Sequence, residues 1–76
     1  MLFKNAAYRE LEAIVAEINN DLSNNYKDNA ILGIKKLEKQ IEETEQSGGL
    51  KPKDLQKFKE LLVHYKADVA SFKRTY

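Results

Sequence analysis

The sequence predicts an all-α fold, an up-down-up bundle of three helices in a single domain that spans residues 1–76. Apolar residues recur at alternating steps of three and four in three stretches, which is the spacing of one helix face. Polar or glycine-containing runs separate these stretches at residues 19–29 and 48–49. A chain of 76 residues can enclose only one small core, so burial against a second copy or a partner would add stability.

The first predicted helix carries an apolar face wide enough to contact two neighbours. That face consists of Tyr8, Leu11, Val15, Ile18 and Leu22, widened by Ala7 and Ile14. Asn5 is suited to cap its start. Asn, Asp and Ser side chains compete for backbone hydrogen bonds, so the polar run favours a turn at about Ser23 to Asn25. Asn25 with Asp28 has the spacing of a capping box. One long bent helix that dimerises is the alternative.

The second predicted helix ends at a pair of glycines. Its apolar face consists of Ala30, Ile34, Leu37, Ile41 and Thr44, with Ile31 beside it. We expect it to run to Ser47, because Gly48 and Gly49 can adopt left-handed dihedral angles without steric cost.

The third predicted helix runs from Pro52 to about Arg74. Proline suits a first helical turn, and Asp54 places negative charge at the positive end of the helix dipole. Its face consists of Leu55, Phe58, Leu62, Tyr65, Val69, Phe72 and Tyr76.

A short glycine turn between two apolar faces predicts an antiparallel hairpin of the second and third helices, with the first helix packed in their groove. Pairing outward from the glycines places Ile41 near Phe58. In this register Glu38 and Glu45 lie beside the lysine series Lys59, Lys66 and Lys73. Opposite charges at these flanking positions favour the antiparallel pairing.

The composition argues against an enzyme. The chain has no cysteine, and its motifs include no phosphate-binding loop or serine nucleophile elbow. The single histidine, His64, has Glu60 and Asp68 four residues to either side, but a metal site needs further ligands. We therefore expect no catalytic residues, no metal and no cofactor, and no small-molecule substrate is evident.

Basic residues concentrate in the last third of the chain, where residues 50–76 hold seven basic and three acidic side chains. A polyanion surface would consist of Lys53, Lys57, Lys59, Lys66, Lys73 and Arg74. Nucleic-acid binding through the third helix is therefore one hypothesis. A solvated face explains these lysines better, since glutamates already account for the seven-residue series and the net charge is only +1.

Four apolar residues remain after the helix faces are assigned: Leu32, Val63, Leu2 and Phe3. Exposed apolar residues on adjoining helices can form a binding patch. The leading functional hypothesis is therefore a small non-enzymatic protein–protein interaction or regulatory module. Self-association into a dimer is one form that this interaction could take. Cytoplasmic residence is the default, because no apolar run has the length of a signal-peptide core or a membrane span.

A membrane-surface protector is the alternative from another class. The layout of short helices with a lysine-rich C-terminal helix resembles that of bacteriocin immunity proteins. Such a resemblance implies residence at a membrane surface.

Overall fold

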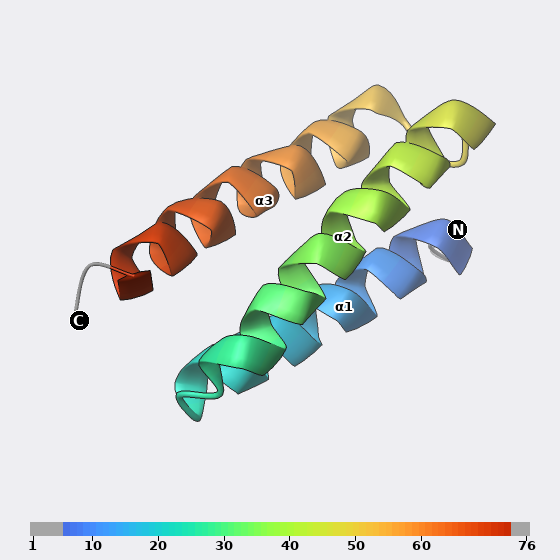
Figure 1. The fold of residues 1–76 in the computed structure, drawn as a ribbon. Coiled ribbons are helices and arrows are strands. Elements are labelled where there is room, and N and C mark those ends of the chain that lie inside the picture. Colours follow the sequence, from blue (N-terminus) through green and yellow to red (C-terminus); the bar gives the residue numbers. More distant parts are fainter. Residues whose placement is uncertain (1–5, 74–76) are drawn as a thin grey trace.

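The computed structural model describes residues 6–73 and, among them, the side chains of residues 6–70. Three helices account for most of this part of the chain: α1 (Ala6–Ser23), α2 (Lys27–Ser47) and α3 (Pro52–Lys73) (Figure 1). They run up, down and up, so the three-helix prediction is confirmed and a continuous bent first helix is excluded. The contact between α1 and α2 is the most extensive one, and α3 packs against α2.

Asn25 creates the turn between α1 and α2. Its φ of 60° lies in the left-handed region, which asparagine tolerates better than most residues. The Tyr26 and Asn25 N–H groups donate to the carbonyls of Asp21 and Leu22 at 2.8 and 3.2 Å, which closes the end of α1. The capping-box prediction is wrong: Tyr26 occupies the N-cap of α2 without a side-chain hydrogen bond, because Asn25 is used to end α1. The predicted cap Asn5 lies outside the described residues.

Gly48 ends α2 as the sequence predicts. Its φ is 72°, and the N–H groups of Gly48 and Gly49 donate to the carbonyls of Glu45 and Thr44. The same arrangement of two hydrogen bonds around one left-handed residue therefore closes both α1 and α2.

Among the side chains of residues 6–70, ten apolar ones form the buried core: Tyr8, Leu11, Ile14, Ile18, Ala30, Ile34, Leu37, Ile41, Phe58 and Tyr65. The apolar faces predicted for the first two helices supply most of it. The face predicted for the third helix is only partly covered, since Leu55, Leu62 and Val69 are half-buried. Leu61, which the prediction leaves out, packs against the core as well. The reason is that α3 packs mainly on one neighbour, so Phe58 and Tyr65 are the only buried side chains of α3 among residues 52–70.

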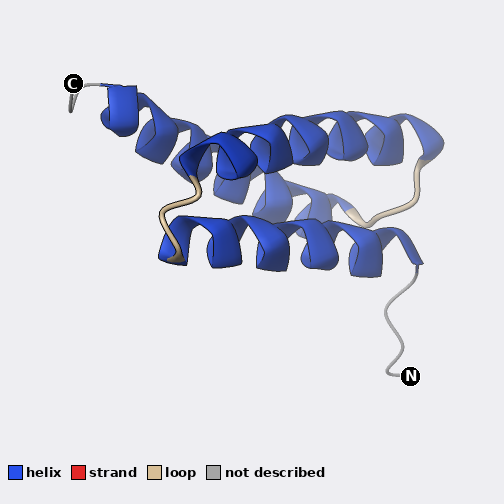
Figure 2. Ribbon diagram, turned by 60° about the horizontal axis from the view of Figure 1, so that its bottom comes forward, coloured by secondary structure: helices blue, strands red, loops and turns tan. Residues whose placement is uncertain are grey.

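The three helices are not equally close along their lengths. In Figures 1 and 2, α1 and α2 run side by side, whereas α3 crosses them and its C-terminal half diverges from α2. The result is an elongated molecule of 46 × 19 × 16 Å. This divergence positions the surfaces described below.

Two ion pairs confirm the predicted register between α2 and α3. Lys59 Nζ lies 2.8 Å from Glu45 Oε2, and Lys66 Nζ lies 2.7 Å from Glu38 Oε2. Two hydrogen bonds join α1 to α3: Lys57 Nζ donates to the Tyr8 hydroxyl, and the Tyr65 hydroxyl donates to Asn19 Oδ1, both at 2.7 Å.

Candidate functional site

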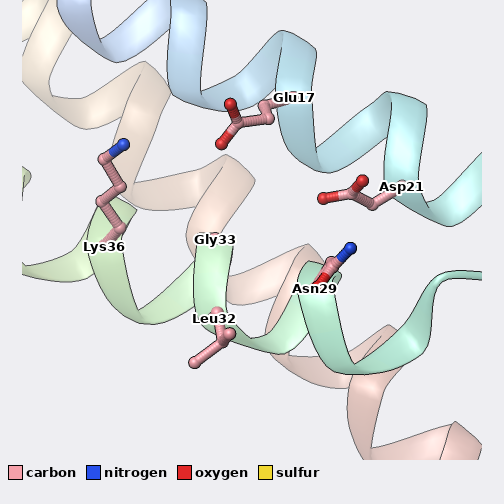
Figure 3. A pocket seen from close by; sticks show the side chains of 6 residues that line it. All are labelled: Glu17, Asp21, Asn29, Leu32, Gly33 and Lys36. Atoms are coloured by element: carbon pink, nitrogen blue, oxygen red, sulfur yellow. The ribbon is translucent and has the colours of Figure 1, made fainter.

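A surface groove of about 380 Å³ lies between α1 and α2. Six residues line it, here called the Leu32 groove: Glu17, Asp21, Asn29, Leu32, Gly33 and Lys36. Glu17 and Asp21 project from α1 toward α2, and Leu32 stands on the α2 side, pointing away from α1 (Figure 3). The groove therefore combines an apolar edge with a charged wall.

Gly33 determines how closely the two helices approach beneath this groove. A Cβ at position 33 would lie 2.8 Å from Cγ1 of Ile18, which is fully buried. No larger residue fits without displacing Ile18. Gly33 also lines the groove, between Leu32 and the two carboxylates (Figure 3).

The carboxylates of Glu17 and Asp21 make no ion pair or side-chain hydrogen bond with any residue between positions 6 and 70. Glu17 and Asp21 lie about one helical turn from each other on the same face of α1. Lys36, at the other end of the groove, is likewise without an ion pair in this part of the chain. The groove thus presents two negative charges and one positive charge to whatever docks there.

The structure confirms that Leu32 and Val63 are exposed, at 63% and 66%. It does not place them in one groove, because the Leu32 groove is lined by α1 and α2 residues. Tyr26, in the turn before α2, is a third large hydrophobic side chain that is exposed, at 55%. Leu2 and Phe3 lie outside the described residues. The role of these residues as a partner surface stays a prediction.

The proposed polyanion surface is largely engaged within the protein. Lys59 and Lys66 pair with glutamates of α2, and Lys57 bonds to Tyr8, while Lys53 is exposed. The Lys73 side chain and Arg74 lie outside the described residues.

Lys57 joins the N-terminal turns of α1 and α3. Its Nζ lies 5.2 Å from the centre of the Tyr8 ring and 5.5 Å from that of Phe58, and the two rings pack edge to face. The hydrogen bond to the Tyr8 hydroxyl raises the pKa of the Lys57 ammonium, while desolvation opposes this effect. These contacts join α1 to α3, so the cluster has a structural role in the bundle.

A second cleft, of about 210 Å³, opens where α3 diverges from α2. Ile31, Ile34 and Val69 form its apolar floor, and the Lys66–Glu38 ion pair lies along its rim with Lys35. This cleft is smaller than the Leu32 groove, and two of its six lining residues are already paired with each other.

Potential metal ligands are scattered among the described residues. No cluster of three His, Asp or Glu side chains that could hold a metal ion occurs among them. His64 is exposed on α3. Within residues 6–73, none of the helices is apolar over enough of its length to cross a bilayer.

Sequence reasoning missed Gly33, Glu17 and Asp21 as parts of a site. An isolated glycine inside a helical pattern was the available signal, since it costs helix stability and often marks close packing. The groove itself could not be inferred, because it depends on the rotation of α1 against α2.

Comparisons with protein-family models, with curated proteins and with solved structures give no match for this chain.

Proposed function

We propose that this chain is a small non-enzymatic protein-interaction module and that the Leu32 groove is its docking surface. The observation that carries the proposal is the 63% exposure of Leu32 beside the carboxylates of Glu17 and Asp21, which form no ion pair with the side chains of residues 6–70. An apolar anchor surrounded by charged groups is the usual composition of a protein-binding surface.

The energetics favour a protein partner at this groove. Complete burial of a leucine side chain contributes about 1.5–3 kcal/mol relative to full exposure. The two carboxylates add orientation rather than much affinity, since exposed ion pairs contribute about 0–1 kcal/mol. A partner that covers Leu32 and supplies a cation to Glu17 or Asp21 would use both features.

Nucleic-acid binding through α3 has weaker support. Phosphate binding needs clustered cations that are free to meet the backbone of the nucleic acid. Lys59 and Lys66 are instead paired with Glu45 and Glu38. A membrane-surface role also depends on these lysines and is weakened for the same reason.

Quantitative affinity capture from an extract of the native host tests the proposal. The wild-type chain and Leu32→Lys are immobilised at equal density, and the bound proteins are measured by mass spectrometry after nuclease treatment. We expect at least one protein to be enriched by the wild type and lost with Leu32→Lys, because the substitution places a charge at the apolar anchor.

Ala16→Lys is the matched control. Ala16 is an exposed residue of α1 that does not line the Leu32 groove, so the same lysine is introduced outside the site. Capture that is equal for the wild type and Leu32→Lys, or equally reduced by both substitutions, contradicts the proposal.

A further inference from the structure

We propose that α3 acts as a lever that opens the second cleft, the one between α2 and α3. In this arrangement α3 pivots where Phe58 is buried, and the contacts of Tyr65 and Lys66 form a latch that holds its C-terminal half closed. None of the residues that line the Leu32 groove belongs to this device.

The first attachment of α3 to the bundle has a buried aromatic side chain at its centre. Phe58 is 1% exposed, and its ring packs edge to face on Tyr8 of α1. Lys57 donates to the Tyr8 hydroxyl, while Lys59 pairs with Glu45 of α2. Moving Phe58 would expose its ring to water and break a ring contact, so this attachment resists displacement. It therefore serves as the pivot.

The second attachment depends more on polar contacts that water can replace. The Tyr65 hydroxyl donates to Asn19 of α1, and Lys66 pairs with Glu38 of α2, both at 2.7 Å. The Lys66 and Glu38 side chains are 50% and 41% exposed, so their pairing adds little stability and is screened by salt. Tyr65 is buried like Phe58, but its ring packs on no second aromatic ring among residues 6–70. This attachment is therefore the one that opens.

Beyond the latch, α3 is held only weakly. Among the next four residues, Ala67, Asp68 and Ala70 are exposed and Val69 is half-buried. The side chains of residues 67–70 make no hydrogen bond or ion pair with α1 or α2. Figures 1 and 2 show α3 diverging from α2 over the same part of the helix. Segments with few buried contacts are the ones that open locally in a folded protein.

The loop before α3 allows the helix to turn as one piece. Gly48 and Gly49 lie in this loop, and glycine tolerates a wide range of backbone angles. Rotation at the loop breaks none of the hydrogen bonds within α3, whereas a bend in the middle of the helix would break several. The helix extends about 22 Å from Phe58 to Lys73, so a small rotation at the pivot moves its far end by several ångströms.

Opening of the lever uncovers the floor of the second cleft. Ile34 is 5% exposed and Ile31 is half-buried, and both line this cleft together with Val69 of α3. Movement of α3 away from α2 exposes both isoleucines, which adds an apolar patch that the closed molecule hides. Any condition or partner that competes for Glu38 or Lys66 favours the open form.

Thiol labelling tests the lever, because the chain has no cysteine of its own. Ile34→Cys places a thiol in the floor of the cleft, and Ile41→Cys makes the identical change nearer the pivot, at a side chain that is 3% exposed. We expect the first thiol to be modified at least about tenfold faster than the second, after each rate is corrected for the global stability of its variant. Tyr65→Phe combined with Lys66→Ala should accelerate the first rate further and leave the second unchanged.

A distance measurement at exposed positions keeps the proposal testable if a buried cysteine prevents folding. Spin labels at positions 35 and 70 report the separation of α2 from the C-terminal half of α3, and labels at positions 42 and 56 report it near the pivot. All four native side chains are exposed. We expect a broader distance distribution for the first pair, shifted to longer distances in high salt, and a narrow one for the second pair.

Three results would overturn the proposal. Modification of both thiols only at the rate of global unfolding would show that the latch does not open by itself. Equally fast modification of both would show that α3 detaches as a whole, which removes the pivot. Equally narrow distance distributions for both label pairs, unchanged by salt, would show that α3 stays fixed on α2.

Discussion

Gly33 of α2 lies so close to Ile18 of α1 that a single added methyl group would come within 2.8 Å of the Ile18 Cγ1 atom. This close approach constrains the pairing of α1 and α2, and Gly33 also lines the Leu32 groove. The same glycine therefore affects both the stability of the bundle and the shape of its candidate binding surface.

Gly33→Ala should destabilise the fold. Alanine gains about 0.8–1.0 kcal/mol of helix propensity over glycine, but overpacking in a buried interface costs about 1–3 kcal/mol. Ile18 is fully buried and β-branched, so it has little freedom to move aside. We expect a net loss of about 1 kcal/mol, measured by urea denaturation, or a decrease of about 4–8 °C in the Tm.

The Ile18→Ala background provides the control for this prediction. In that background the new methyl group enters vacated space, so Gly33→Ala should become neutral or stabilising. Equal effects in both backgrounds would show that contact with Ile18 is not the cause.

Phe58→Ala and Leu62→Ala should differ in cost. Phe58 is 1% exposed and packs edge to face on Tyr8, so its loss should cost about 3–5 kcal/mol. Leu62 occupies a comparable place in the sequence pattern but is only half-buried, and its truncation should cost less than 2 kcal/mol. Chemical denaturation of both variants checks the order. Equal losses would mean that α3 lies deeper in the bundle than the structure shows.

The ion pairs between α2 and α3 should stabilise the fold only modestly, because both are exposed to solvent. Lys59→Glu with Lys66→Glu should cost about 0.5–1 kcal/mol. Adding Glu38→Lys and Glu45→Lys should restore part of this loss, and the restoration should shrink in high salt. The unfolding measurements are made on dilute protein, so that contacts between copies do not contribute. No restoration in the fourfold variant argues against the pairing.

Stability should fall above about pH 10. Burial raises the pKa of Tyr65 above its ordinary value of 10.0. The hydrogen bond from Lys57 to Tyr8 raises the pKa of Lys57 above its ordinary value of 10.5. As the pH rises, the unfolded chain loses these two protons at a lower pH than the folded chain does. The contribution of the two groups to the free energy of unfolding is therefore fully present below about pH 10 and is lost as the pH rises through their folded-state pKa values.

Tyr65→Phe should flatten this alkaline decrease, measured as the free energy of unfolding between pH 8 and 11.5. The exposed Tyr26 provides a control of the same chemistry, since Tyr26→Phe removes a hydroxyl outside the core. A steep decrease that persists in Tyr65→Phe would assign the alkaline transition to other groups.

Much of the fold could be predicted because its signals are local. Helix spacing, the Gly48 stop and the facing charges of Glu38 and Lys66 each depend on residues close in sequence or in one simple register. The N-cap of α2 was missed for a related reason: Asn25 is suited to both ending one helix and starting the next, and only the structure shows which it does.

The candidate site could be predicted only in part. Leu32 and Val63 could be identified as exposed, since they lie off the apolar faces of their helices. Their neighbours depend on how α1 rotates against α2 and on how far α3 diverges, and these are set by packing at Ile18, Gly33 and Phe58. Such packing between distant segments leaves no periodic trace in the sequence.

Site-specific photo-cross-linking in the native host tests the docking role of the Leu32 groove most directly. A photoreactive amino acid is placed at position 32, or at position 16 as the exposed control, and the products are identified by mass spectrometry. The groove predicts a discrete cross-link to a protein from position 32, either to a second copy or to another chain, and none from position 16. Cross-linking from position 32 that does not exceed the level at position 16 would contradict the account.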